Sequence, residues 1–178
     1  MKKFLLILLI CILAQINHRE SRLTDSQIAS LRETYPIYGV KIPPLIEMHT
    51  PAFTEVKNSV ETFVYGEVVG EAQTYHKLYD FYEYPLSIIK DTKGKYQTGD
   101  HITITANKIF EDYNPKLSAG MKVVVPVTAD TEVAGRTHYT VIGMYYVTED
   151  GYVLSAYEES DVNYSGLKIE ELLKRLKK

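Results

Sequence analysis

Short stretches that alternate apolar and polar residues recur about every ten residues between positions 60 and 157, a spacing typical of strands in small β-barrels. In the first stretch, Val60–Gly70, the side chains of Val64, Gly66 and Val68 fall on one face of an extended chain. A glycine inside a strand tends to mark a bend or the close approach of another backbone. We therefore expect Val60–Gly70 to be a bent first strand around which the later strands wrap.

Five more stretches have a strand pattern: Tyr79–Lys90, His101–Thr105, Met121–Val127, Tyr139–Val147 and Gly151–Tyr157. Pro85 has no N–H to donate to a neighbouring strand, so it predicts an edge or a bulge. In Met121–Val127, Met121 and the alternate valines are expected to point inward. The last two stretches are joined by Thr148–Gly151, and an Asp-Gly turn between β-rich stretches indicates a hairpin. The sequence therefore predicts a mainly β fold, a small antiparallel barrel of five to six strands.

Helical patterns flank these stretches. Thr24–Gln27 matches a capping box and opens a predicted helix over Thr24–Thr34. Pro51–Asn58 is a second predicted short helix, and the proline-rich stretch before it is expected to be extended. After Ser165, the expected cap, apolar residues are spaced as on one face of a C-terminal amphipathic helix: Ile169, Leu172, Leu173 and Leu176. Its basic end suits either a membrane surface or, more simply, a helix that flanks the barrel.

The N-terminus has the pattern of an export signal. Lys2 and Lys3 precede an apolar run, Phe4–Ala14, which is shorter than the roughly 20 residues that a membrane-spanning helix needs. A signal peptide is the main interpretation; an uncleaved anchor and a buried helix are alternatives. Cys11 is a lipidation candidate because Leu8–Cys11 resembles a bacterial lipobox, although Ile10 replaces the expected small residue.

We accordingly divide the chain into residues 1–14, a signal peptide or anchor; residues 15–59, a helical and proline-rich approach; and residues 60–178, the OB-like barrel with its C-terminal helix. The expected location is outside the cell, either secreted or tethered to the outer face of the cytoplasmic membrane. Contact with the membrane is expected only through the leader or a lipid on Cys11.

The charge balance and the cysteine content argue against several classes of function. Without Lys2 and Lys3 the chain has 18 basic residues against 23 acidic ones. This balance argues against a nucleic-acid partner, which is held mainly by Lys and Arg. Cys11 is the only cysteine, so the chain after the leader has no thiol nucleophile and no disulfide.

No catalytic or cofactor motif stands out, and we expect no cofactor. Among the histidines, His76, His101 and His138 would form a metal site only if the fold gathered them, and exposed positions are the simpler expectation. Glu158–Asp161 lacks the glycine and alternating oxygens of a calcium loop, so it is expected to be a solvated connection. No Gly-x-Ser-x-Gly elbow and no phosphate-binding loop occur.

Aromatic residues are the remaining candidates for ligand binding. The chain has fifteen tyrosines and no tryptophan. Tyr96, Tyr113 and Tyr164 fall in predicted loops or at strand ends, where a tyrosine ring can stack on a sugar, a peptide or a base. The alternative is that these rings cover the ends of the barrel.

Residues 60–157 resemble uncharacterised exported bacterial β-barrel proteins with an OB-like layout. The matching stretches are Val64–Val69, Tyr82–Lys90, Gly99–Ile104, Leu117–Gly120 with the valine strand, and Tyr146–Tyr152. Pro85 within a strand and Asp91 directly after Lys90, in place of glycine, depart from that pattern. The family has no assigned activity to transfer to particular residues.

Together these features predict an exported, non-enzymatic β-barrel that acts as a binding or accessory module at the cell surface. Its partner is expected to be an envelope protein or another surface component. The alternative is an envelope-associated hydrolase that uses Asp, Glu or His residues, and a deep pocket that gathers a histidine with carboxylates would favour it.

Overall fold

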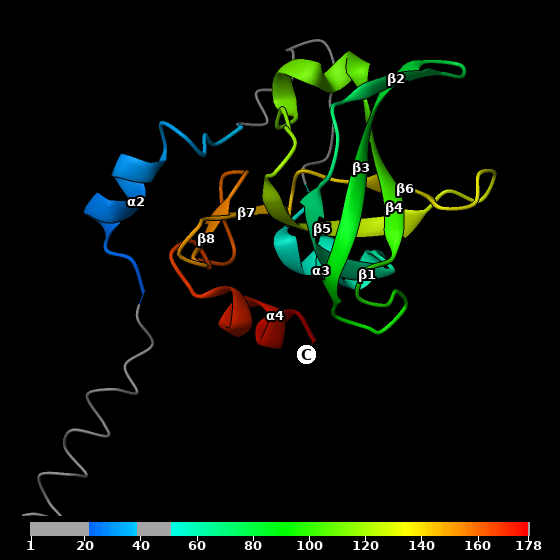
Figure 1. The fold of residues 1–178 in the computed structure, drawn as a ribbon. Helices are drawn as coiled ribbons and strands as arrows, with labels where there is room; N and C mark the ends of the chain where they lie inside the picture. Colours follow the sequence, from blue (N-terminus) through cyan, green and yellow to red (C-terminus); the bar gives the residue numbers. More distant parts are fainter. Residues whose placement is uncertain (1–21, 39–50, 178) are drawn as a thin grey trace, which may run out of the picture.

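The computed structural model describes residues 22–38 and 51–177, which form a closed five-stranded barrel with three further strands and short helical segments (Figure 1). The strands are β1 (Thr62–Val68), β2 (Gln73–His76), β3 (Asp80–Asp91), β4 (His101–Asn107), β5 (Lys122–Ala129), β6 (Arg136–Tyr139), β7 (Tyr145–Val147) and β8 (Val153–Ser155). The helical segments are α2 (Asp25–Leu31), α3 (Phe53–Ser59), the 3-10 helix η1 (Lys108–Tyr113) and α4 (Ile169–Lys177).

The barrel confirms the predicted fold class. Its strands lie in the order β1, β3, β4, β6, β5, and β5 pairs with β1 to close the ring. Numbered along the chain, the five strands follow the path first, second, third, fifth, fourth, with η1 between the third and the fourth. This is the Greek-key layout of an OB-fold. One pairing, between β4 and β6, is parallel, whereas the other four are antiparallel.

Gly66 marks the bend that the sequence predicts in the first strand. The pairing of β1 with β3 shifts register between Tyr65 and Gly66. A Cβ at position 66 would lie 2.7 Å from the backbone oxygen of Ser87, so only glycine allows the two strands to approach this closely. Pro85 also lies where it is expected, at the point where β3 stops pairing with β1 and begins to pair with β2.

The barrel interior is filled. Eight inward side chains of the barrel strands are at most 5% exposed: Val64, Leu86, Ile88, Ile102, Ile104, Val123, Val125 and Val127. They form one continuous apolar cluster with residues of α3 and α4. A ligand that binds this protein must therefore contact the outside of the barrel. Met121, predicted to be inward, is instead only partly buried and lines a surface pocket.

The predicted strand Tyr139–Val147 is divided in the structure. β6 ends at Tyr139, a turn follows in which the Met144 amide donates to the Val141 carbonyl at 3.0 Å, and β7 begins at Tyr145. Gly143 has a φ of +88°, which favours glycine and prevents a continuous strand. As a result β6 closes the barrel, while β7 leaves it and forms the predicted hairpin with β8.

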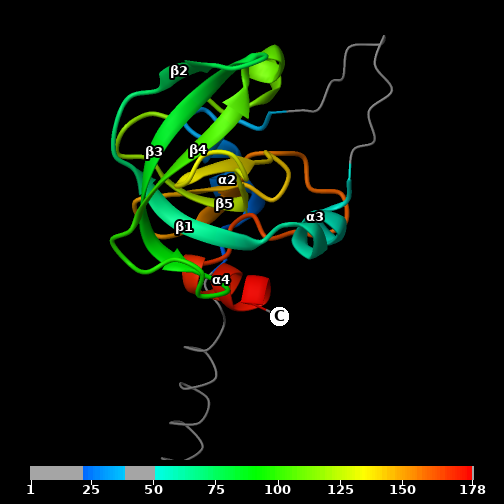
Figure 2. The same cartoon turned by 90° about the vertical axis from the view of Figure 1, so that its right-hand side faces the viewer.

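The predicted helices form, but the predicted cap of the last one is wrong. The capping box at Thr24 is present, and the apolar face of α4 is buried. α4 begins at Ile169, and Ser165 does not cap it. The Ser165 hydroxyl instead donates to Glu159 at 2.7 Å and accepts from the Ser155 amide at 3.0 Å. Figure 2 shows α3 and α4 outside the barrel beside β1.

The acidic connection Glu158–Asp161 is largely solvated, as expected: three of its four residues are exposed, and Glu159 is partly buried. Glu159 accepts hydrogen bonds from the Tyr145 hydroxyl and the Tyr164 amide. Asp161 accepts from the amides of Phe53 and Thr54 and so fixes the start of α3. Two of these carboxylates therefore hold together segments that are far apart in the chain.

Several sequence-based expectations fall outside the described residues. These are the leader with Cys11, His18, His49 and most of the proline-rich stretch. In the part of the chain that the structure describes, no helix has the length and apolar character required to span a bilayer.

The Asp91 carboxylate should make the free energy of unfolding depend on pH. Burial raises its pKa, but hydrogen bonds from the Thr62 hydroxyl and from backbone amides of the following turn outweigh burial and hold the pKa below its usual 3.8. A lowered pKa in the folded state stabilises the fold above the unfolded-state pKa, and this contribution is lost as the pH falls through the folded-state value. We expect Asp91→Asn to lower the free energy of unfolding by about 2 kcal/mol at pH 7.

Urea unfolding at a series of pH values measures this effect. The difference between Asp91→Asn and the parent should shrink as the pH falls below about 4, because the parent's own carboxyl then becomes protonated. Asp112→Asn, at an exposed carboxylate of η1, is the control and should change stability little at any pH. A constant difference across the whole pH range would show that the Asp91 charge is not the stabilising feature.

Candidate binding face

Four strands present one continuous outer side, which we call the outer face: the outward sides of β2, β3, β4 and β6. Residues directly opposite each other on paired strands share a side of the sheet. Tyr75 lies opposite Phe81, Glu83 opposite Thr105, and Thr105 in turn opposite His138. The register therefore places side chains from three separate parts of the chain next to one another.

Three aromatic side chains, which we call the ring row, cross this face. The ring centres of Tyr75 and Phe81 are 6.5 Å apart, and those of Phe81 and His138 are 6.2 Å apart. All three side chains are at least partly exposed. Neighbouring rings are tilted against each other by 41° and 46°, so the ring row is a stepped aromatic strip.

Arg136 holds the Tyr75 end of the ring row. Its guanidinium carbon lies 3.8 Å from the centre of the Tyr75 ring, within the range of a cation–π contact. Arg136 also forms an ion pair with Glu83, and the two side chains are 13% and 16% exposed. Since β2 pairs with β3 alone, the stack on Arg136 adds a second attachment for Tyr75 and restricts the orientation of its ring.

His138 is held at the other end. Thr105 donates its hydroxyl proton to the Thr137 carbonyl at 3.1 Å, and the Thr105 oxygen also lies within hydrogen-bond distance of the His138 Nδ1, at 2.8 Å. The His138 Nε2 faces Asp130 at 3.6 Å. Thr105 is 2% exposed and its proton is already donated, so this Thr–His–Asp arrangement lacks an accessible nucleophile. We interpret it as a device that orients the histidine ring.

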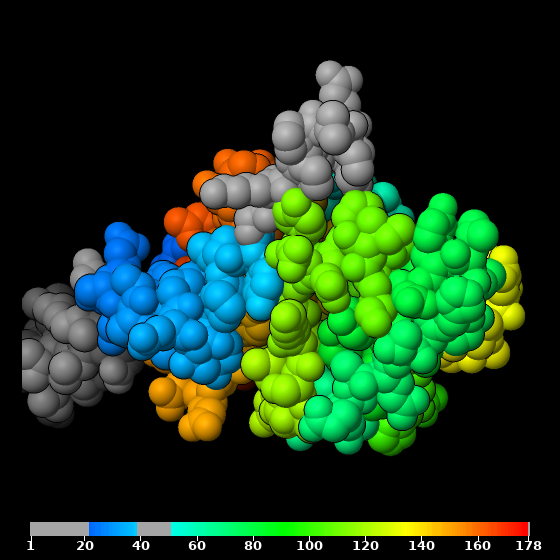
Figure 3. Space-filling view, turned by 90° about the horizontal axis from the view of Figure 1, so that it is seen from above, coloured from blue at the N-terminus to red at the C-terminus, as the bar shows by residue number. Residues whose placement is uncertain are grey.

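Two loops border the outer face. These are residues 77–79, at the tip of the β2–β3 hairpin, and residues 130–135, between β5 and β6. The Lys77–Glu132 ion pair joins them. Leu78 and Tyr79, at the tip of the β2–β3 hairpin, are 78% and 49% exposed. Figure 3 shows the hairpin in blue-green beside the yellow loop 130–135, with η1 adjacent.

Asp130 fixes the second loop. Hydrogen bonds from the backbone amides of Glu132 and Val133, the former the larger cause, lower the pKa of the Asp130 carboxyl. Asp130 thus stays charged at the edge of the outer face. Over residues 73–83 and 130–138 together, two basic side chains stand against four acidic ones, so the charge of this region is negative.

The tyrosines predicted from the sequence as ligand contacts are not brought together. Tyr96, in the turn after β3, and Tyr164, before α4, both pack against the apolar core. The Tyr164 ring meets that of Phe53 edge-on at 5.4 Å. Tyr113 ends η1 and is partly exposed. Their role in ligand binding stays a prediction, and the outer face lies elsewhere.

The histidines of the barrel also lie apart. His76 pairs with Asp80 at 2.6 Å, His138 lies in the ring row, and His101 is exposed at the start of β4. Within the described residues, no three His, Cys, Asp or Glu side chains are arranged to hold a metal ion. Only His138 of these three belongs to the outer face described above.

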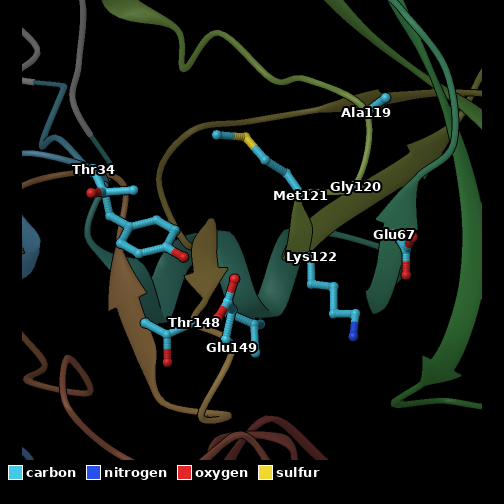
Figure 4. A pocket seen from close by; sticks show the side chains of 10 residues that line it. Thr34, Glu67, Ala119, Gly120, Met121, Lys122, Thr148 and Glu149 are labelled. Carbon is cyan, nitrogen blue, oxygen red and sulfur yellow. The ribbon is translucent and has the colours of Figure 1, made fainter.

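A separate surface pocket of about 540 Å³ lies over β1, β5 and β7 (Figure 4). Glu67, Met121, Lys122 and Glu149 are among the residues that line it, and no histidine does. It therefore does not combine histidine with carboxylates, the arrangement that would favour hydrolase chemistry.

Sequence patterns missed the residues of the outer face for an identifiable reason. Phe81 and Glu83 alternate with the inward Tyr82 and Tyr84, which signals that they point outward. Nothing local indicates that the short strands β2 and β6 exist, and each contributes one ring to the ring row.

Comparison with known proteins adds no relative. No protein-family model matches this chain, and no curated protein matches its sequence at a significant level.

Proposed function

We propose that this protein is an exported, non-enzymatic binding module and that its outer face binds a neutral oligosaccharide of the cell surface. The observation that carries this proposal is the ring row, held at both ends and bordered by two loops. Two of its strands, β3 and β4, are the second and third strands of the barrel, with which OB-folds contact oligonucleotides and oligosaccharides.

The chemistry of the outer face suits sugar rings. The apolar side of a pyranose stacks on an aromatic ring, and its hydroxyls need donors and acceptors nearby. Asp130, Lys77 and Glu132 supply both kinds of group at the border of the ring row. A ring that is already held loses little freedom when a ligand binds, which increases affinity.

The charge of the outer face distinguishes between oligonucleotides and oligosaccharides as ligands. An oligonucleotide brings one negative charge per nucleotide and is held mainly by Lys and Arg. Here the region is net negative, and Arg136 is already paired with Glu83. A neutral oligosaccharide meets no such repulsion. The N-terminal leader supports a location where surface sugars are found.

Removing the ring row should abolish most of the binding. We expect Tyr75→Ala and Phe81→Ala each to weaken the affinity for a neutral oligosaccharide about 10-fold, because each loses a stacking contact worth about 1–2 kcal/mol. Calorimetry on a panel of neutral and acidic oligosaccharides measures this, with Tyr113→Ala as the matched change outside the outer face.

Two further measurements separate the alternatives. Incubation with a bound oligosaccharide should release no new reducing ends if the outer face only binds its ligand. A single-stranded oligonucleotide should bind more weakly than the oligosaccharide at the same salt concentration. The proposal fails if the oligonucleotide binds more tightly, or if Tyr113→Ala reduces oligosaccharide binding as much as Tyr75→Ala does.

A further inference from the structure

The surface pocket over β1, β5 and β7 is built from four segments that are far apart in the chain. Tyr35 follows α2, Glu67 lies in β1, Met121 and Lys122 begin β5, and Glu149 follows β7. Figure 4 shows the Lys122 side chain extending between those of Glu149 and Glu67. The volume of about 540 Å³ falls within the usual range for a small-molecule site.

The pocket has three charged side chains, those of Glu67, Lys122 and Glu149, and none of them takes part in an interaction that stabilises the described part of the fold. Glu67 and Lys122 lie directly opposite each other on β1 and β5. Even so, the side chains of Glu67, Lys122 and Glu149 make no ion pair or hydrogen bond with any residue that the structure describes. Opposite charges at this cross-strand position usually pair. Two carboxylates and one ammonium therefore remain available to a ligand.

The wall of the pocket beside these charges is apolar and held in place. The Tyr35 ring packs against Tyr146, with ring centres 5.5 Å apart, and the Tyr35 amide donates to the Leu31 carbonyl at 2.9 Å. Val147, opposite Lys122 on β7, is 5% exposed. Met121 adds a flexible thioether that adapts to the shape of a bound chain.

We propose that this pocket binds a basic amino acid, or the basic end of a short peptide. Such a ligand has two ammonium groups and one carboxylate, which complement the two carboxylates and one ammonium of Glu67, Glu149 and Lys122. Its methylene chain contacts Met121 and the Tyr35 ring. The charge pattern selects against simple diacids, which would meet two like charges, and the apolar wall favours a ligand with a long side chain.

This site is independent of the outer face. The two share none of the residues that define them, and they lie on different strands of the sheet. A ligand in the pocket would connect the segment after α2, the barrel and the β7–β8 hairpin, because the lining residues come from all three.

Methyl NMR on protein labelled at methionine tests the proposal directly. Met121 lines the pocket, whereas Met144 is fully buried and reports only on the integrity of the fold. Titration with L-lysine should shift the Met121 methyl resonance and leave that of Met144 in place. Norleucine, which lacks the side-chain amine, should bind at least 3-fold more weakly, a ratio that one half-exposed charge contact supplies.

Substitutions in the pocket test which charged side chain binds which group of the ligand. Glu149→Gln should weaken lysine binding about 3–10-fold, and Glu158→Gln, an exposed acidic residue elsewhere, should not. Lys122→Gln should weaken binding of L-lysine but not of lysine amide, which lacks the carboxylate. Tyr75→Ala should leave the titration unchanged. A Met121 resonance that does not move with lysine, or that moves alike in the parent and in Glu149→Gln, overturns the proposal.

Discussion

Replacing Gly66 by alanine is expected to lower the free energy of unfolding by about 3 kcal/mol, at the upper end of the cost of overpacking a core. The added Cβ would lie 2.7 Å from the Ser87 backbone oxygen and 2.8 Å from the Leu86 Cγ. The backbone cannot yield easily, because β1 is paired with β3 on one side and β5 on the other. Thermal unfolding followed by circular dichroism should show a midpoint lower by roughly 10 °C.

Gly94→Ala is the matched control for this change. Gly94 lies in the turn after β3 with a φ of +75°, and nothing lies within 4 Å of a Cβ added there. The alanine should therefore cost only the backbone strain of a positive φ, about 1 kcal/mol. If Gly66→Ala were no more destabilising than Gly94→Ala, the result would contradict the claim that β1 and β3 approach too closely at the bulge to accept a side chain.

Replacing Arg136 by methionine is expected to cost about 2–4 kcal/mol. Glu83 and Arg136 are 84% and 87% buried, so removal of the cation leaves a carboxylate that is largely out of water and uncompensated. The stack on Tyr75 is lost as well. Urea unfolding gives the free energy, and weaker oligosaccharide binding should accompany it, because the Tyr75 ring is no longer held.

The double variant Glu83→Met with Arg136→Met separates charge from packing. A buried ion pair replaced as a whole by apolar side chains of similar volume often costs little, because both desolvation penalties disappear. The Arg136 Nε has no hydrogen-bond partner within the described residues, so the ion pair leaves one of its buried polar atoms without a hydrogen bond. The double variant should therefore recover most of the lost stability. If the stability losses of Glu83→Met and Arg136→Met simply added up in the double variant, the ion pair would not be the cause of the loss seen in Arg136→Met.

The sequence alone predicted most of the local structure. The period of two in Val60–Gly70 and in the later β-rich stretches identified the strands, because burial on one side of a strand requires that alternation. The Asp-Gly turn predicted the β7–β8 hairpin, the capping box predicted the start of α2, and the apolar spacing predicted the buried face of α4. Each of these signals is contained within about ten neighbouring residues.

Only the tertiary structure decided which strands meet. The parallel pairing of β4 with β6, about thirty residues later, brings His138 to Phe81 and Arg136 to Tyr75. Local patterns do not contain this information, because the pairing depends on closing the whole ring and not on the residues of the four-residue β6 alone. The same holds for the pocket of Glu67, Lys122 and Glu149, whose charges come together only when β1, β5 and β7 are aligned. Most strands were thus predictable from short-range burial patterns, whereas β2, β6 and both sites depend on long-range pairing.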